Sequence, residues 1–258
     1  MAARWSSSVN YEHGLSGKTA LVTGASSGFG AHFAETLARA GASLIIGARR
    51  AEMLTTTAER IVAAGGQCEI ISLDVASPDS IARSVDVIER ANILVNNAGI
   101  VRESALLDHC ESDWDKVLDT NAKGIFLMTQ AVAKGMKRRG GGSIINIASI
   151  TGLRQAGGVV SYAVSKAAAI QLTKISALEL ARFGIRVNAL APGYFATDFN
   201  GNFWQSEAGK KMIGRIPKRR LGELQDLDGP LLLLASDASA YMNGSVVEVD
   251  GGHLVSTL

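Results

Sequence analysis

Tyr162 and Lys166 are spaced as an acid–base pair needs to be. They lie four residues apart in the stretch YAVSKAAAIQLTK, which we predict to be helical, and this spacing puts both side chains on one helix face, one turn apart. A free tyrosine has a pKa of about 10 and is therefore a poor acid–base catalyst near neutral pH. We expect the Lys166 ammonium group to lower the pKa of Tyr162, because a nearby positive charge stabilises the phenolate. Such a phenol could donate a proton to the oxygen of a carbonyl group during its reduction.

Two further polar residues could complete this catalytic site. Ser149 ends a β-type run thirteen residues before Tyr162, where its hydroxyl could bind a substrate oxygen and stabilise the charge that develops on it. Asn121 is an amide within the apolar periodicity of a separate predicted helix. Taken alone, Asn121 would be interpreted as a hydrogen-bonded polar residue of that helix. We predict Asn121, Ser149, Tyr162 and Lys166 as the catalytic residues.

A glycine-rich loop near the start of the chain could bind a pyrophosphate. The loop TGASSGFG (23–30) directly follows a predicted strand and precedes a predicted helix. Glycines let the backbone turn tightly and approach the phosphates, whose charge then meets the N–H groups of the helix N-terminus. A glycine-rich loop without a ligand is the alternative, since the G-x3-G-x-G spacing alone is a weak signal. The predicted cofactor-binding residues here are Gly24, Ser26, Ser27, Gly28, Phe29 and Gly30.

The ends of the next three strands carry residues that suit the rest of a dinucleotide. Arg49 and Arg50 stand where NAD sites usually place an acidic residue; a guanidinium binds a 2′-phosphate that a carboxylate would repel, which favours NADP(H). The alternative is that both arginines lie in solvent. Asp74 could accept a hydrogen bond from the adenine amino group beside Val75, or it could cap the helix that begins near Pro78. The fourth strand end adds Asn97, Ala98 and Gly99, small or amide residues beside which the cofactor could lie.

These residues need a sheet whose strand ends bring them together. Short β-type runs span residues 18–24, 43–48, 68–74, 92–98, 143–149, 185–191 and 245–251, and helix-length segments separate most of them. That alternation predicts βαβ units and a parallel sheet, in which ligands bind beyond the carboxyl ends of the strands. We predict one doubly wound α/β domain over residues 16–258, with residues 1–15 as an N-terminal extension.

Composition excludes several other classes of protein. The 258 residues are 47% apolar and carry 26 Lys+Arg against 24 Asp+Glu, a net charge of +2. This balance excludes a disordered chain and argues against a nucleic-acid partner. No apolar run approaches the length of a membrane span, and no secretory signal is evident. Two cysteines suit neither a disulfide framework nor a metal site. We expect a cytoplasmic protein without a metal.

Taken together, these motifs resemble the short-chain dehydrogenase/reductase family in its basic form of about 250 residues. The resemblance rests on TGASSGFG (23–30), Asp74, NNAG (96–99), Asn121, Ser149, Tyr162, Lys166, Pro192, Gly193 and Thr197. Phe29 departs from the family's usual aliphatic residue, Asn92 from its frequent Asp, and residues 78–90 look short.

The resemblance implies a Rossmann-like seven-stranded parallel sheet, hydride transfer between NAD(P)(H) and a carbonyl or alcohol, and a homo-oligomer, either a tetramer or a dimer. Lys166 would then also hold the nicotinamide ribose, beside Tyr162, and Asn121 would position a water that relays protons. Pro192, Gly193, the backbone of Phe195 and the Thr197 hydroxyl would fix the carboxamide.

The stretch from residue 194 to residue 220 interrupts the strand–helix alternation, and we predict it to be a lid over the substrate site. Its aromatic residues favour a largely apolar substrate pocket that closes by loop motion; packing of a short helical pair onto the body is the alternative. Besides Ser149 and Tyr162, the predicted substrate residues are Gln155, Tyr194 and Phe199.

The predicted function is reduction of a ketone, or oxidation of a secondary alcohol, with NADP(H). An alternative is a reductase of 3-oxoacyl thioesters on acyl-carrier protein or coenzyme A, since residues 210–220 carry six basic side chains that could attract an anionic carrier. Phe183 weakens this alternative, because such reductases commonly have a basic residue there; the basic run could also be a solvated face. A non-enzymatic NADPH sensor is a third hypothesis.

Overall fold

The computed structural model describes residues 14–196 and 203–256. Within them, seven parallel strands form one sheet in the order β3-β2-β1-β4-β5-β6-β7. The strands are β1 (Thr19–Thr23), β2 (Ser43–Ala48), β3 (Cys68–Ser72), β4 (Ile93–Asn96), β5 (Gly142–Ile147), β6 (Ile185–Pro192) and β7 (Val246–Val249). The predicted fold class is confirmed, and each strand begins and ends within two residues of its predicted range.

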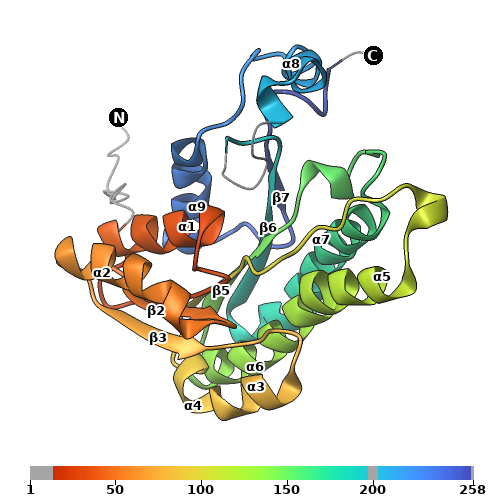
Figure 1. Cartoon of the computed structure of the whole chain (residues 1–258). Coiled ribbons are helices and arrows are strands. Elements are labelled where there is room, and N and C mark those ends of the chain that lie inside the picture. Colours follow the sequence, from red (N-terminus) through yellow and green to blue (C-terminus); the bar gives the residue numbers. More distant parts are fainter. Residues whose placement is uncertain (1–13, 197–202, 257–258) are drawn as a thin grey trace, which may run out of the picture.

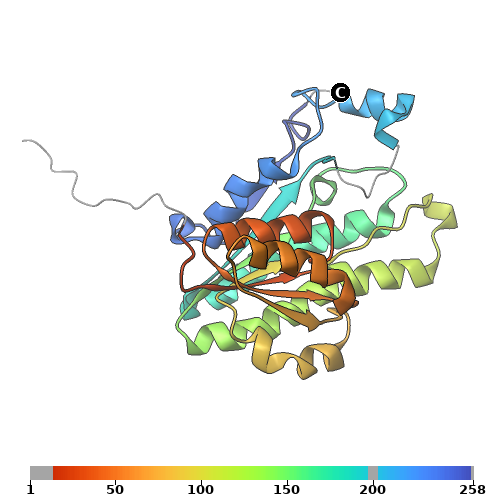
Figure 2. The same cartoon turned by 60° about the vertical axis from the view of Figure 1, so that its left-hand side comes forward.

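Helices cover both faces of the sheet (Figure 1). One face is covered by α1 (Gly28–Arg39), α2 (Thr55–Ala63) and α9 (Asp228–Ala235). The other face is covered by α3 (Pro78–Arg83), α4 (Val85–Ile88), α6 (Gly124–Arg138) and α7 (Val160–Leu180), with α5 (Glu111–Leu118) beside α7. The short α8 (Glu207–Ile213) stands apart from these layers (Figures 1 and 2).

Alternate residues of each central strand enter the two cores. In β1, Ala20 and Val22 join the cluster under α1 and α9, whereas Leu21 joins the cluster under α6. All three side chains are fully buried. The apolar runs are continuous because helices cover both faces. Leu15 is also buried and packs into the first cluster. No helix among the residues described is long and apolar enough to cross a bilayer.

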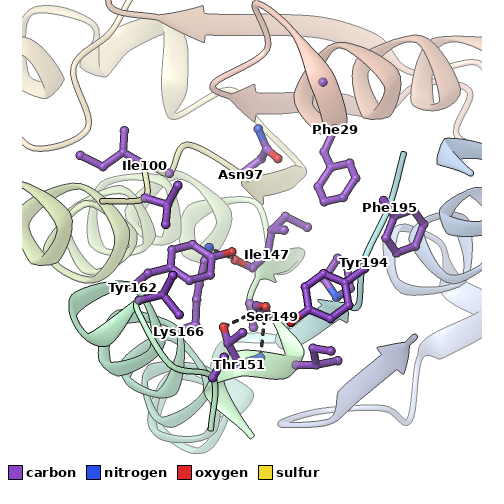
Figure 3. Close-up of a pocket in the computed structure, with 18 of the residues that line it drawn as sticks. Phe29, Asn97, Ile100, Ile147, Ser149, Thr151, Tyr162, Lys166, Tyr194 and Phe195 are labelled. Atoms are coloured by element: carbon purple, nitrogen blue, oxygen red, sulfur yellow. Dashed lines mark hydrogen bonds between the residues drawn. The ribbon is translucent and has the colours of Figure 1, made fainter. Parts of the chain in front are cut away.

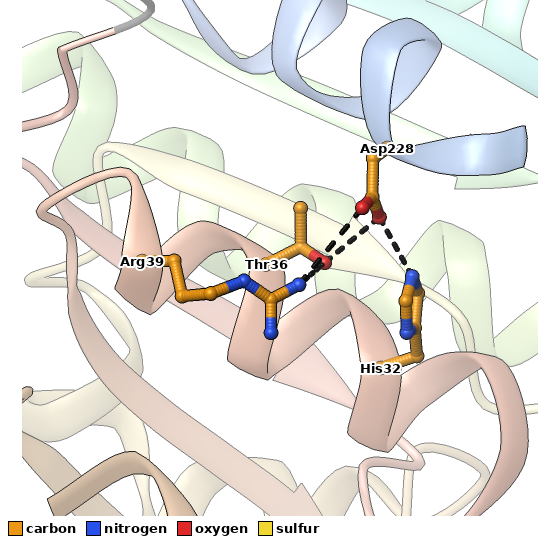
Figure 4. Close-up of polar contacts among 4 residues, drawn as sticks. All are labelled: His32, Thr36, Arg39 and Asp228. Carbon is orange, nitrogen blue, oxygen red and sulfur yellow. Dashed lines mark hydrogen bonds and ion pairs between the residues drawn. The ribbon is translucent and has the colours of Figure 1, made fainter. Parts of the chain in front are cut away.

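A carboxylate on α9 fastens that helix to α1, the helix that follows the glycine loop (Figure 4). Asp228 Oδ1 lies 2.6 Å from His32 Nε2 and accepts a hydrogen bond of 2.9 Å from Thr36 Oγ1. Arg39 adds an outer contact, with its Nη2 donating to Thr36 Oγ1 at 2.9 Å and lying 3.9 Å from Asp228 Oδ2. Within this cluster, the hydrogen bond between Asp228 and Thr36 involves a buried side chain, whereas the Arg39 side chain is half exposed.

Replacing this carboxylate is expected to weaken the packing of α1 on α9. Asp228→Ala leaves the buried Thr36 hydroxyl and His32 without their acceptor, so we expect the free energy of unfolding to fall by about 2 kcal/mol. Arg39→Ala is the matched control and should cost under about 0.5 kcal/mol, because exposed ion pairs contribute little. Urea unfolding measures both values, and equal losses in the two variants would contradict this account of the cluster.

Candidate active site

A cleft of about 1790 Å³ runs along the carboxyl ends of the strands. It is lined by a residue just beyond each of the first six strands: Gly24, Arg49, Asp74, Asn97, Ser149 and Gly193. Figure 3 shows the part of the cleft where Tyr162, Lys166 and Ser149 lie opposite Phe29 and Asn97. The cleft therefore lies at the same edge of the sheet as the predicted dinucleotide-binding and catalytic residues.

The glycine loop takes a conformation that side chains would disturb. Gly24 and Gly28 have φ angles of +66° and +54°, in the left-handed region that favours glycine. A Cβ atom on Gly24 would lie 2.8 Å from the Cα of Ala98, and one on Gly30 would collide with the Gly24 carbonyl. Around Gly28, by contrast, a Cβ would meet nothing within 4 Å. The loop is thus packed tightly against the end of β4, with open space at Gly28.

Asn97 ties the end of β4 to this loop. Its Nδ2 donates to the carbonyls of Thr23, at 3.0 Å, and Gly24, at 3.1 Å. The Thr23 hydroxyl in turn accepts hydrogen bonds from the backbone N–H groups of Asn97 and Ala98. The Nδ2 atom of Asn97 therefore holds the loop in shape, and Asn97 also lines the cleft.

The N-terminus of α1 faces the cleft through the glycine loop. Ser27 is the N-cap of this 12-residue helix, but its side chain makes no capping hydrogen bond. The first N–H groups of a helix have no intrahelical partner, and together with the helix dipole they favour an anion. The open space at Gly28 and the uncapped helix start fit a pyrophosphate.

Arg49 and Arg50 are exposed and line the cleft at the end of β2. Neither guanidinium forms an ion pair with any residue that the structure describes. Both are therefore free to contact a phosphate, and the residues present fit a 2′-phosphorylated nucleotide.

Asp74 lines the same end of the cleft, together with Val75. The alternative in which Asp74 caps the next helix is wrong. Ser77 is the N-cap of α3 and accepts a hydrogen bond of 3.2 Å from the Ser80 N–H, while Asp74 Oδ1 accepts from the backbone of Ala76 at 3.0 Å. The reason is distance along the chain: Asp74 stands four residues before Pro78, too early to reach the first turn.

Phe29, the departure from the family pattern, has a packing partner from another part of the chain. Its ring meets the ring of Phe195 edge-on, with 5.4 Å between centroids, and stacks on Phe33 at 5.8 Å. Phe195 is buried and, like Pro192 and Gly193, lines the cleft beyond β6. These aromatic contacts connect the glycine loop with the end of β6. Thr197 lies outside the residues described.

Tyr162 and Ser149 meet in the middle of the cleft. Tyr162 is half-buried, and burial raises the pKa of its phenol above the ordinary value, a shift that a hydrogen bond with Ser149 opposes and the nearby Tyr194 reinforces. Ser149 is also held by Thr151, whose N–H and hydroxyl lie 3.2 and 3.0 Å from its Oγ. The phenol and the serine hydroxyl can therefore bind one substrate oxygen.

Lys166 lies one turn along α7 from Tyr162, as the spacing predicts, but it does not lower the pKa of the phenol. Its Nζ donates a hydrogen bond of 2.6 Å to the Ile147 carbonyl and lies 5.5 Å from the centroid of the Tyr162 ring. The ammonium group thus faces the ring and the end of β5. Lys166 is itself buried, which lowers its own pKa to about 8. Burial of Tyr162 is the largest influence on its pKa, which is therefore raised and not lowered as we expected.

Asn121 is fully buried in a π-helical turn, Asp119–Lys123, between α5 and α6. Its Oδ1 accepts from the Ile100 N–H at 2.8 Å, and its Nδ2 donates to the Ile100 carbonyl at 2.8 Å and to Ser165 Oγ at 3.0 Å. Both amide hydrogens are therefore used, while Oδ1 can accept one more hydrogen bond, and the role of Asn121 in positioning a relay water stays a prediction. The side chain also joins the segment after β4 to α7, where Ser165 donates to the Tyr162 carbonyl at 2.7 Å.

The far end of the cleft is more polar than predicted. Gln155 and Tyr194 line it, as expected, and so does Arg215 of the basic run 210–220. Arg154 and His253, which the sequence analysis did not single out, line it as well. Charged residues from separate loops thus converge at this end, which the prediction of a largely apolar pocket did not anticipate. Phe199 lies outside the residues described. His253 could have been found from the sequence, because it follows the end of β7 closely and ligands of such sheets bind beyond the strand ends.

The predicted lid is fastened at its base. Phe195 bridges Gly222, whose N–H donates to the Tyr194 carbonyl at 2.9 Å. Two members of the basic run form ion pairs with nearby carboxylates. Arg220 Nη1 lies 2.6 Å from Asp226 Oδ2, and Lys210 Nζ lies 2.9 Å from Glu207 Oε1. Arg215 is the member of this run that lines the cleft. Closure of the lid stays a prediction.

Known proteins resemble the chain over nearly its whole length. The family model described as short chain dehydrogenase matches residues 18–208. Gluconate 5-dehydrogenase from Gluconobacter oxydans is 39% identical over 94% of this chain and 96% of its own. A 3-oxoacyl-[acyl-carrier-protein] reductase from Thermotoga maritima is 38% identical over 93% and 99%, respectively. The crystal structure of a gluconate 5-dehydrogenase from Burkholderia cenocepacia, in complex with NADP and tartrate, matches with a TM-score of 0.91 and 37% identity, covering 95% of this chain and 98% of that one.

Proposed function

The chain belongs to the short-chain dehydrogenase family, and we propose that it transfers a hydride between NADP(H) and a ketone or secondary alcohol. The observation that carries this proposal is the position of Tyr162, Ser149 and Lys166 in the same cleft as the glycine loop. A nonenzymatic NADPH sensor would need the loop but would have no use for a phenol and a serine hydroxyl that can share one oxygen.

In this proposal the nicotinamide supplies or accepts the hydride, and the chain's own residues bind and protonate the substrate oxygen. The Tyr162 phenol donates its proton to that oxygen during reduction, and the Ser149 hydroxyl donates a hydrogen bond to it. Because burial raises the pKa of Tyr162, the phenol keeps its proton at neutral pH and suits the acid role in reduction. Asn121 acts as a positioning residue, through its bonds to Ile100 and Ser165.

The cofactor contacts proposed are those that line the cleft. The pyrophosphate would lie on residues 24–30, the 2′-phosphate on Arg49 and Arg50, and the adenine beside Asp74 and Val75. Lys166 would hold the nicotinamide ribose next to Tyr162. The carboxamide would lie against Pro192, Gly193 and Phe195, with Thr197 as the further proposed contact.

The arginine at the end of β2 is expected to decide the choice of cofactor. Arg49→Asp replaces a phosphate-binding cation with a repelling carboxylate, so the ratio of kcat/KM for NADPH to that for NADH should fall by about 10–100-fold. Arg83→Asp, an exposed residue of α3 that does not line the cleft, makes the same charge change and should leave the ratio unaltered. A wild-type protein that already prefers NADH would contradict the assignment of Arg49.

A substrate panel tests the reaction itself. NADPH oxidation would be followed with neutral ketones, with oxo acids of the gluconate type that relatives are named for, and with acetoacetyl-coenzyme A. Selective turnover of the thioester would favour the carrier-dependent alternative. Lys137 and Arg182 are exposed and lie over the ring of Phe183, 4.5 and 4.7 Å from its centroid, so they could add to a basic surface for such a carrier. If no carbonyl compound is reduced, the sensor hypothesis replaces the enzyme.

A further inference from the structure

Three basic side chains gather at the end of the cleft beyond Tyr162. Arg154 lies on the loop after β5, Arg215 follows α8, and His253 lies in the segment after β7. Tyr194 connects this group with the catalytic residues, because its phenol raises the pKa of Tyr162 and is itself influenced by the charge of Arg154. The rings of Tyr194 and His253 are 5.4 Å apart. The basic group is therefore next to the reacting position.

No carboxylate of the residues described forms an ion pair with the two arginines, although Asp250 lies close enough to act on His253. Neither Arg154 nor Arg215 forms an ion pair within that part of the chain. The acidic residues that line the cleft are Glu103, which is exposed, and Asp74, which lies at the dinucleotide end. This end of the cleft thus has an excess of positive charge that a negatively charged ligand would balance.

Arg154 is held so that one edge of its guanidinium stays available. Its Nη1 donates to the His253 carbonyl at 2.8 Å and lies 3.5 Å from Ser256 Oγ. No hydrogen bond to a described residue uses Nε or Nη2, which together form the edge that binds a carboxylate through two parallel bonds. A half-buried guanidinium fixed at one nitrogen loses little freedom on binding a ligand.

His253 adds an unsatisfied polar atom to this group. Its Nδ1 is buried and has no hydrogen-bond partner in the described part of the chain. Burial and the charges of Arg154 and Arg215 lower its pKa, although Asp250 opposes the shift. The imidazole is thus neutral at neutral pH.

We propose that Arg154, with Arg215 and His253 beside it, binds a carboxylate of the substrate, so that the substrates are oxo acids and the corresponding hydroxy acids. The reacting carbon then lies at Tyr162 and Ser149 while the carboxylate lies at Arg154. This inference rests on the proposed function and deepens it by naming the substrate class. A carboxylate at Arg154 also orients the substrate, because two parallel hydrogen bonds fix its direction in the cleft.

Charge-selective binding tests this site without relying on turnover. The NADP-saturated protein is titrated calorimetrically with tartrate and with threitol, which has alcohol groups in place of both carboxylates. We expect wild-type protein to bind tartrate at least about tenfold more tightly than threitol, since one charge-assisted pair is worth that much. Arg154→Gln should lose about tenfold or more of the tartrate affinity, and Arg154→Lys should recover part of it.

Two further variants separate ligand binding from a structural role of Arg154. Arg215→Gln removes the second cation without touching the hydrogen bonds of residues 253–256, and should weaken tartrate binding by about threefold. Arg83→Gln, far from the site, should bind as the wild type does. In kinetics, Arg154→Gln should lower kcat/KM for an oxo acid more than for a neutral ketone.

The proposal is overturned if the wild-type protein binds tartrate and threitol equally, or if Arg154→Gln loses both ligands and NADP together. Loss of both ligands and NADP would mean that Arg154 has only a structural role, in holding residues 253–256 in place. Charge-selective binding in a protein that reduces no carbonyl compound would support the carboxylate site and refute the proposed function, so the two failures are distinguishable.

Discussion

Tyr162→Phe is expected to lower kcat for ketone reduction with NADPH by about 10²–10⁴-fold, the usual contribution of a positioned acid. The substitution removes one hydroxyl from a half-buried ring and keeps the ring itself. Because only the proton donor is lost, the affinity for NADPH should change by less than about twofold. Steady-state kinetics and a fluorescence titration of NADPH measure the two quantities separately.

Tyr194→Phe is the matched control, since Tyr194 is the second phenol in this part of the cleft (Figure 3). Its hydroxyl is close enough to Tyr162 to influence the pKa of that residue, but it has no hydrogen bond with Ser149 among the contacts described. We expect it to change KM more than kcat. Retention of most of kcat in Tyr162→Phe would remove this residue from the mechanism.

Lys166→Met should stabilise the fold at neutral pH, although it removes the proposed contact to the nicotinamide ribose. Lys166 is buried, and the drop in its pKa from 10.5 to about 8 means that its charged form is disfavoured in the folded protein. That shift corresponds to about 3 kcal/mol, from which the lost hydrogen bond to Ile147 subtracts about 1 kcal/mol. We therefore expect the free energy of unfolding to rise by about 2 kcal/mol at pH 7.

The pH dependence of this gain follows from the direction of the shift. Below about pH 8 the lysine is charged in both the folded and unfolded states, so the cost of burying its charge is fully present. Between about pH 8 and 10.5 the folded state loses this proton first, and the cost disappears. The stability difference between Lys166→Met and wild type should thus be largest at pH 7 and shrink toward pH 10.

Lys174→Met provides the control on the same helix. Lys174 is exposed on α7, so its substitution should change the free energy of unfolding by less than about 0.5 kcal/mol at any pH in this range. Chemical denaturation at several pH values measures all three proteins. A destabilised Lys166→Met at pH 7 would mean that the hydrogen bond to Ile147 outweighs the cost of burying the charge.

The parts of the site that could be predicted from sequence depend on local physics. Gly24 and Gly28 need positive φ angles that disfavour other residues, and the apolar runs in the strands need helices on both faces. Spacing along one helix was likewise enough to place Tyr162 and Lys166 together. That Asp74 lines the cleft could not be decided in this way, because it depends on how the segment after β3 folds against the rest of the chain.

The sequence by itself determined the family, the doubly wound sheet and the position of the dinucleotide loop, because each follows from residues that are neighbours in the chain or repeat with a regular period. Only the tertiary structure decided that the pKa of Tyr162 is raised and that the far end of the cleft is basic. The pKa of a buried group depends on how much water its surroundings exclude. The charge of the cleft depends on Arg154, Arg215 and His253, which come from three separate segments and become neighbours when the chain folds.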